Sequence, residues 1–272
     1  MMKKTILLSL VAMLCTIDIC AARKFRYAMP DGQINLISYN VRQSGAAKAD
    51  GDNAWEFRRH ATIEMMRREA PSVIGLQEAK IDQVQYIERN MPQYVRIGVG
   101  RDDGKDAGEM TAIFYLKSRF DLLGSGTFWL SETPDEVSRG WDAKYNRTVT
   151  WVHLREKSTG SEFYYFNGHL DHKGVRAREE SMKLIARKAL EIAGEDAAVV
   201  IGGDFNATSD NPIYAPLLEI SFLTRTAAPV TDNRPTSNAW GKRPGTVIDH
   251  LFARNIECLE YHTLDGDYGA PY

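Results

Sequence analysis

The feature that most constrains the fold of this chain is a set of apolar runs of strand length. Each run has a polar side chain at or near its end. Asn40 ends the run INLISYN, Glu78 follows VIGLQ, and Asp204 follows VVIGG. His169 in FNGHLDH and Asp249 in TVIDHLF occupy similar positions. The carboxyl ends of neighbouring strands meet at one edge of an α/β sheet, and binding sites form there. We therefore expect an α/β protein with a polar site at a sheet edge.

Strand-like and helix-like segments alternate along the chain. Met182, Ile185 and Ala189 form an apolar stripe at helical spacing, and Pro71 ends an earlier amphipathic segment. We expect strands at 34–41, 73–77, 94–99, 111–116, 147–154, 162–169, 198–202, 246–252 and 256–263, and helices at 53–70, 80–90 and 175–193. Several consecutive strands among helices favour two packed sheets with helices outside.

The amino terminus has the pattern of a secretory signal peptide over residues 1–22. Lys3 and Lys4 precede an apolar stretch at 5–17, and the small-residue sequence CAA follows at 20–22. We expect an exported protein that is periplasmic, secreted or at the cell surface. The alternatives are an amino-terminal membrane anchor and a lipoprotein anchor on the cysteine at position 20.

The remainder resembles one ordinary globular domain, which we place at residues 31–272. Hydrophobic residues make up 43% of the chain and charged residues 26%, which excludes disordered and fibrous classes. The 34 basic and 36 acidic residues leave a net charge of −2, which argues against a basic nucleic-acid coat. Three cysteines are too few for a disulfide scaffold. We expect a monomer without a stable membrane span.

The polar residues at the strand ends combine carboxylates, amides and imidazole without a thiolate. This mixture favours Mg²⁺, with Mn²⁺ as the alternative, because hard cations prefer oxygen ligands. Glu78 is the best single candidate ligand, and Asp204 suits metal binding or orientation of a water molecule. Asn206 shares a face with Asp204 in an extended segment, and His169 suits donation to a phosphoryl oxygen.

Simpler structural roles compete with each of these interpretations. Glu78 suits the start of a helix, where a carboxylate is favoured by the helix dipole. Asp204 and Asn206 suit a tight turn, and His169 suits a hydrogen-bonded place in the core.

Three further residues are candidates for substrate binding. Asp171 and His172 follow His169 closely, and Arg147 begins a predicted strand. The alternative for Asp171 is that it holds a loop, and the alternative for Arg147 is a structural or solvated role.

Five short motifs in a fixed order resemble the endonuclease/exonuclease/phosphatase family, whose fold is that of DNase I. The motifs are SYN (38–40), QE (77–78), NGHLDH (167–172), GDFN (203–206) and IDHLF (248–252). The stretches GTFWLSETP (126–134) and RTVTW (147–151) are similar to those of bacterial members. Each motif is weak alone, but the ordered set covers the chain from about residue 34 onward.

The resemblance implies a four-layer α/β sandwich, with two packed central β-sheets flanked by helices. It also implies Mg²⁺-dependent hydrolysis of a phosphoester by in-line attack of water. By motif, Asn40 and Glu78 belong to the metal site and His169 contacts the phosphate. Asp204 orients or deprotonates the water, and Asn206 helps to place it.

The resemblance also assigns Asp249 to a pair with the histidine of a terminal Ser-Asp-His motif. The sequence given stops at Tyr272 without that motif. We therefore expect this chain to lack one carboxy-terminal strand and one catalytic histidine. Its neighbour His250 does not replace that histidine, because adjacent residues of a strand point to opposite faces.

Together these patterns predict an exported, metal-dependent phosphoester hydrolase, either a phosphodiesterase or a phosphomonoesterase. The substrate we expect is a small phosphorylated metabolite or a phospholipid head group. Basic pairs occur at Arg58-Arg59 and Arg67-Arg68, on one predicted helix, and form no track for a nucleic-acid backbone. A secreted nuclease is the less favoured alternative. A catalytically impaired phosphate-binding or interaction protein is the other.

Overall fold

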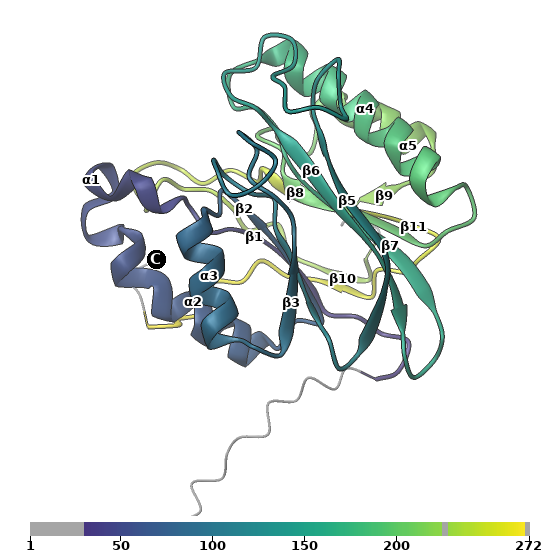
Figure 1. Cartoon of the computed structure of the whole chain (residues 1–272), viewed down its shortest axis with the longest axis horizontal. Helices are drawn as coiled ribbons and strands as arrows, with labels where there is room; N and C mark the ends of the chain where they lie inside the picture. Colours follow the sequence, from purple (N-terminus) through teal and green to yellow (C-terminus); the bar gives the residue numbers. More distant parts are fainter. Residues whose placement is uncertain (1–29, 225–227, 270–272) are drawn as a thin grey trace, which may run out of the picture.

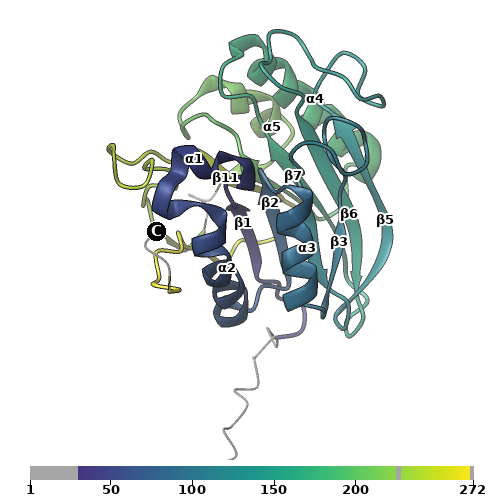
Figure 2. The same cartoon turned by 60° about the vertical axis from the view of Figure 1, so that its left-hand side comes forward.

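The computed structural model describes residues 30–224 and 228–269. Two β-sheets pack face to face, and helices cover their outer faces, which gives four layers (Figures 1 and 2). The predicted α/β sandwich is therefore confirmed. The predicted signal peptide lies outside the described residues. Within the described ranges, no helix is both long and apolar enough to cross a bilayer.

The first sheet has the strand order β1-β2-β4-β3. Its strands are β1 (Leu36–Asn40), β2 (Val73–Gln77), β3 (Tyr94–Ile97) and β4 (Ile113–Leu116). The run VIGLQ is buried at every position, as expected for an inner strand. β1 and β2 are parallel, with Asn40 opposite Gln77, so their carboxyl ends lie side by side.

The second sheet has the order β5-β6-β7-β8-β11-β9. Its strands are β5 (Phe120–Trp129), β6 (Thr148–Glu156), β7 (Glu162–His169), β8 (Val199–Asp204), β9 (Leu223–Thr224) and β11 (Asp249–Arg254). His169 lies opposite Asp204 in the parallel β7–β8 pair, and Asp249 lies opposite Asp204 in the antiparallel β8–β11 pair. Three candidate site residues thus share one edge. A separate parallel pair joins β10 (Val230–Thr231) to β12 (Glu260–Tyr261).

Helices α2 (Trp55–Glu69) and α3 (Ile81–Asn90) cover the first sheet, and α4 (Val175–Ala193) and α5 (Ala215–Glu219) cover the second (Figure 1). A short α1 (Ala47–Asp50) precedes α2. Met182, Ile185 and Ala189 of α4 are buried against the second sheet, so the predicted apolar stripe is confirmed.

A buried amide joins the two sheets. The Nδ2 atom of Asn167, on β7, donates to the carbonyl oxygens of Leu76 (2.9 Å) and Ala112 (3.1 Å). Its Oδ1 atom accepts from Nε2 of Gln77 at 2.6 Å. Val73, Ile113, Val152, Tyr165 and other apolar residues fill the rest of this interface. Asn167 therefore holds the ends of β2 and β7 in register across the sandwich.

The predicted strand ranges needed three corrections. The long strand β5 was missed because its middle contains Gly124 and Gly126, which weaken a strand pattern. These glycines accommodate the Trp151 ring of β6, which would lie within 3.4 Å of a Cβ atom at either position. The strand expected at 246–252 begins only at Asp249, since Thr246 instead pairs with Ser237 in a loop. Of the strand expected at 256–263, only Glu260–Tyr261 pairs with another strand.

Candidate active site

The predicted strand-end residues meet at one edge of the sandwich. Asn40 from the first sheet donates through Nδ2 to Oε1 of Glu78 at 3.0 Å and to Oδ2 of Asp204, in the second sheet, at 2.9 Å. Glu78 follows β2 with a φ of 61°, a left-handed conformation that is uncommon for residues other than glycine. Strained backbone of this kind is concentrated at functional sites.

A tight turn after β8 presents Asp204 and Asn206 together. The backbone N–H of Asn206 donates to Oδ1 of Asp204 at 3.0 Å, and Asn206 has a φ of 50°. Its Nδ2 atom donates to the carbonyl of Leu170 at 3.0 Å and lies 3.3 Å from Nε2 of His169. Gly203 has a φ of 146°, and a Cβ atom there would lie 1.9 Å from the carbonyl oxygen of Gly168. The turn therefore requires glycine directly before Asp204.

We call Asn40, Glu78, Asp204 and Asp249 the carboxylate wall. Burial raises the pKa of Asp204, and burial together with the neighbouring Asp204 carboxylate raises the pKa of Asp249 well above its ordinary value. Among the residues that the structure describes, Asp204 has one ion-pair candidate, the His169 ring at 3.9 Å, and Asp249 has none. Glu78 has an ion-pair partner, since Nη1 of Arg42 lies 3.7 Å from its Oε2 atom. Within the described residues, the acidic members of the wall that have no arginine or lysine in ion-pair range are therefore the two aspartates.

The donor chemistry of the carboxylate wall fits a hard divalent cation. Its side chains offer carboxylate and amide oxygens, and its buried acids lack the cation that would favour their ionised form. Over residues 30–224 and 228–269, no group of three or more His, Cys, Asp and Glu residues has metal-binding spacing. A site with one or two protein ligands and several waters suits Mg²⁺ better than zinc. Glu78 and Asn40 are the residues that could hold it.

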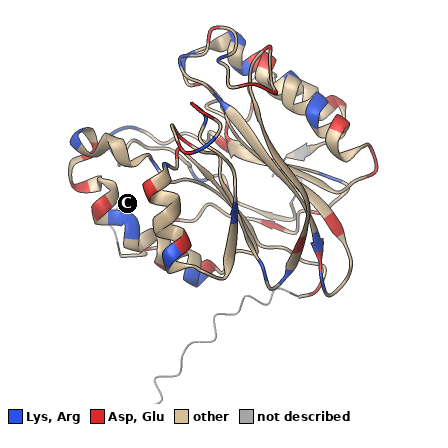
Figure 3. Cartoon of the chain, viewed as in Figure 1, with Lys and Arg blue, Asp and Glu red and all other residues tan. Residues whose placement is uncertain are grey.

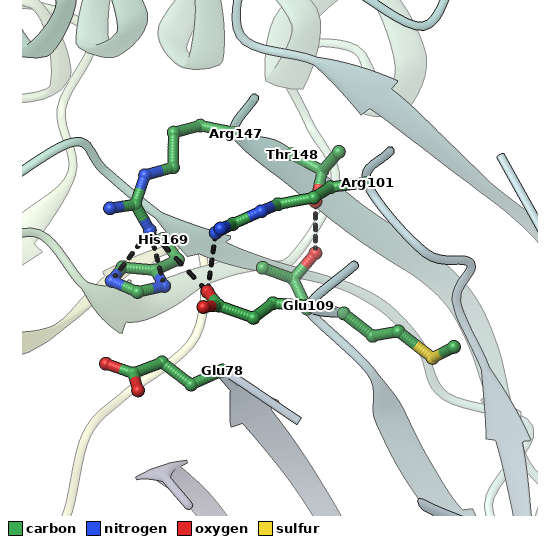
Figure 4. Close-up of a pocket in the computed structure, with 8 residues that line it drawn as sticks. Glu78, Arg101, Glu109, Arg147, Thr148 and His169 are labelled. Carbon is green, nitrogen blue, oxygen red and sulfur yellow. Dashed lines mark hydrogen bonds and ion pairs between the residues drawn. The ribbon is translucent and has the colours of Figure 1, made fainter. Parts of the chain in front are cut away.

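The opposite side of the site is built on Arg147, at the start of β6. Its Nη1 atom lies 2.9 Å from Nδ1 and 3.1 Å from Nε2 of His169 (Figure 4). Its Nε atom donates to Oδ2 of Asp171 at 3.3 Å, and Nη2 lies 3.1 Å from Nδ1 of His172. The predicted residues Arg147, His169, Asp171 and His172 therefore form one cluster.

His169 is buried in this cluster and is neutral near pH 7. Burial lowers its pKa well below the ordinary value, and the positive charges of Arg147 and Arg101 lower it further. A neutral imidazole accepts a hydrogen bond at one ring nitrogen and donates at the other. His169 can therefore accept from Arg147 and still donate to a bound group.

Asp171 is buried and joins two loops at the rim. Its Oδ1 atom accepts from the backbone N–H groups of Lys173 and Gly174, both at 2.9 Å, and Oδ2 accepts from Tyr145 at 3.4 Å. These bonds, together with the charge of Arg147, hold its pKa far below the ordinary value. Since both oxygens are occupied, this placement favours the interpretation in which Asp171 holds loops over one in which it contacts substrate.

The model of the Endonuclease/Exonuclease/phosphatase family matches residues 37–268 of this chain. The chain belongs to this family. Among solved structures, it is 36% identical to the mannosyl-6-phosphatase of Bacteroides thetaiotaomicron, covering 81% of this chain and 85% of that one with a TM-score of 0.76. A functionally unknown conserved protein of Enterococcus faecalis is 26% identical, with a TM-score of 0.77 over 87% of this chain and 94% of that one.

Two curated relatives are each 25% identical to this chain. An uncharacterised protein of Acanthamoeba polyphaga mimivirus is 25% identical over 86% of this chain and 95% of its own length. Nocturnin of Drosophila melanogaster is also 25% identical, over 62% of this chain and 27% of its own length.

A small pocket lies between the two sides of the site, and sequence reasoning missed part of its lining. It is lined by Glu78, Arg101, Glu109, Met110, Thr111, Arg147, Thr148 and His169 (Figure 4). Arg101 forms an ion pair with Glu109, whose Oε2 atom lies 4.0 Å from Nη1 of Arg147. We call Arg101, Arg147 and His169 the arginine wall.

A local signal for Arg101 was present in the sequence. It lies in the glycine-rich segment GVGRDDG after β3, where Gly98 has a φ of 124° and Gly104 a φ of 70°. Such glycines mark a loop of special shape, and charged residues on such loops often carry function. Glu109 had no comparable signal.

Proposed function

We propose that this protein is a Mg²⁺-dependent phosphomonoesterase that acts on a small phosphorylated solute. Members of its family are hydrolases that act on phosphoesters. One observation carries the proposal: Glu78 of the carboxylate wall lines a small pocket together with the arginine wall, and the buried Asp204, which Asn40 links to Glu78, has a raised pKa. The first wall suits a divalent cation and the second suits phosphate oxygens. Export is part of the proposal and is supported by the amino-terminal sequence pattern alone.

Glu78 and Asn40 would hold the ion, with Mn²⁺ as an alternative to Mg²⁺. When bound, Mg²⁺ supplies Lewis-acid stabilisation of the negative charge on the phosphoryl group. Arg101 and Arg147 bind the phosphate oxygens through guanidinium N–H groups. His169 donates from its protonated ring nitrogen to a phosphoryl oxygen, whose charge increases toward the transition state.

Asp204 orients the attacking water and accepts its proton. Its carboxylate is held by Asn40 from the first sheet and by the backbone of Asn206 from its own turn. These two fixed contacts keep a general base in position for in-line attack. Asn206, which lies between Asp204 and His169, orients the water or a phosphoryl oxygen.

The proposed substrate class is a sugar phosphate. Support comes from the 36% identical relative named as a mannosyl-6-phosphatase and from the two arginines that line the pocket. A ribonuclease is the second candidate, because the 3'-5'-exoribonuclease subunit Ccr4 of Emericella nidulans is 30% identical over 52% of this chain. Acidic and basic residues are interspersed along α2, α3 and α4 (Figure 3), which favours a small substrate over a polyanion.

The test is a panel of mannose 6-phosphate, bis(p-nitrophenyl) phosphate and single-stranded RNA, with Mg²⁺ or with EDTA. We expect the monoester to be hydrolysed fastest and EDTA to abolish turnover. Glu78→Ala should lower kcat/KM by about 10²–10⁴-fold, while the exposed Glu179→Gln serves as the matched control. Unchanged turnover in EDTA and in Glu78→Ala would contradict the metal site, and faster cleavage of RNA would contradict the substrate class.

A further inference from the structure

Two aromatic rings lie beside the two arginines that line the pocket. The rings of Tyr145 and His172 are stacked, with centroids 6.0 Å apart and planes inclined by 26°. Tyr145 is 42% exposed and His172 is also exposed. A large aromatic side chain that is fixed yet open to solvent is a common element of ligand sites.

The stacked pair is in direct contact with both arginines of the pocket. The Cζ atom of Arg101 lies 5.1 Å from the centre of the Tyr145 ring, and Nζ of Lys144 lies at the same distance. Both distances are within the range of cation–π attraction. His172 contacts Nη2 of Arg147 through Nδ1. A group that extends from a phosphate held by these arginines is therefore within reach of the two rings.

The loops that carry the pair are held rigidly. Asp171 accepts from the backbone of Tyr145 and from two residues that follow His172. Asp142 accepts from the N–H of Ala177, in the first turn of α4, at 2.6 Å, and Asn146 donates to the carbonyl of Arg101 at 3.2 Å. A surface fixed in advance loses little conformational entropy when it binds a ligand.

We propose that Tyr145 and His172 form a subsite for the leaving group, and that this subsite selects a phosphate ester whose alcohol carries a pyranose ring. The inference rests on the proposed phosphomonoesterase function and adds the residues that determine its specificity. The C–H face of a pyranose packs against an aromatic ring, while its hydroxyl groups remain hydrated or bond to Lys144. An acyclic polyol presents no comparable flat face, so it gains less from the pair.

The experiment compares mannose 6-phosphate with glycerol 3-phosphate in Tyr145→Ala and Tyr145→Phe. We expect Tyr145→Ala to lower the preference for the sugar phosphate, measured as the ratio of kcat/KM values, by about three- to tenfold. Tyr145→Phe keeps the ring and should retain the ratio within about twofold. Phe57→Ala, which removes an exposed aromatic ring from α2, is the matched control and should not change the ratio.

An equal loss on both substrates in Tyr145→Ala would overturn the subsite, because it would show only a supporting role for Arg101. A loss in Tyr145→Phe as large as in Tyr145→Ala would overturn recognition through the ring face. Calorimetric binding of mannose 6-phosphate to Glu78→Ala, with and without Tyr145→Ala, separates this inference from the proposed function. If the wild type hydrolyses no monoester but Tyr145→Ala weakens this binding, the function fails and the subsite stands; unchanged binding overturns the subsite.

Discussion

The two walls of the site differ in how their charges are balanced. On the arginine wall, Arg147 contacts Asp171, His169 and His172, and Arg101 pairs with Glu109. On the carboxylate wall, burial raises the pKa values of Asp204 and Asp249, and Asn40 supplies a neutral amide. The fold balances the charges of the first wall from its own side chains, whereas the two aspartates of the second have no arginine or lysine ion pair among the described residues, and we propose that a bound cation balances them.

This difference separates stability from function within one pocket. A buried charge that has its partners stabilises the fold, and removing one partner leaves the other unpaired. A buried carboxylate without a partner costs free energy, which a bound cation would recover. Substitutions on the two walls should therefore have different effects on folding even where both lower activity.

The largest effect is expected from Asp204→Asn. An amide cannot accept the proton of the attacking water, so kcat should fall by about 10²–10⁴-fold. Initial rates on the preferred monoester with saturating Mg²⁺ measure this loss. Asp135→Asn, at an exposed acidic position, is the control. A variant that keeps more than a tenth of the wild-type kcat would remove Asp204 from the role of general base.

Arg147→Lys should have the next largest effect, and it should lower both activity and stability. Lysine keeps the charge but cannot contact Asp171, His169 and His172 at once. We expect kcat/KM to fall by about 10- to 100-fold and the free energy of unfolding to fall by about 1–3 kcal/mol. Kinetics and urea unfolding measure the two quantities, with Arg155→Lys at an exposed position of β6 as the control. Full stability with lost activity would show that the arginine wall contributes nothing to the fold.

The smallest effect is a dependence of stability on pH in protein freed of metal by a chelator. Asp204 has its pKa raised to about 6 by burial, so the folded state binds protons more tightly than the unfolded state. Its contribution to stability is present below about pH 4 and is lost as the pH rises through 6. Asp171, whose pKa is lowered, acts in the opposite sense: its contribution is complete above its ordinary pKa of 3.8 and is lost only as the pH falls below that value.

Thermal unfolding between pH 4.5 and pH 8 covers the range in which Asp204 titrates while the contribution of Asp171 stays constant, and Asp204→Asn isolates the contribution of Asp204. At pH 7.5 we expect the metal-free variant to be more stable than the metal-free wild type by about 1–2 kcal/mol. Added Mg²⁺ should stabilise the wild type more than the variant. Equal stability of the two metal-free proteins at every pH would show that the carboxylate wall carries no unfavourable charge.

The parts of this molecule that sequence predicted are those with local causes. VIGLQ is a buried strand because Val73, Ile74 and Leu76 are apolar and lie close together in the sequence, and Glu78 and Asp204 stand out because a polar residue interrupts an apolar pattern. The strand β5 could not be predicted, because its two glycines are accommodated by the Trp151 ring of the neighbouring strand. The place of Glu109 in the site could not be predicted either, because it depends on the approach of Arg101 and Arg147. Neither contact produces a recognisable pattern in the sequence around β5 or around Glu109.

The Asn167 amide between the sheets has a mechanical consequence. Asn40 and Glu78 belong to one sheet and Arg147, His169 and Asp204 to the other, so a slide of a single ångström between the layers would part them. The three hydrogen bonds of Asn167 fix the two sheets relative to each other close to that edge. The catalytic rate of this protein should therefore depend on the alignment of the two sheets. On warming, we expect activity to be lost at a lower temperature than the secondary structure of either sheet.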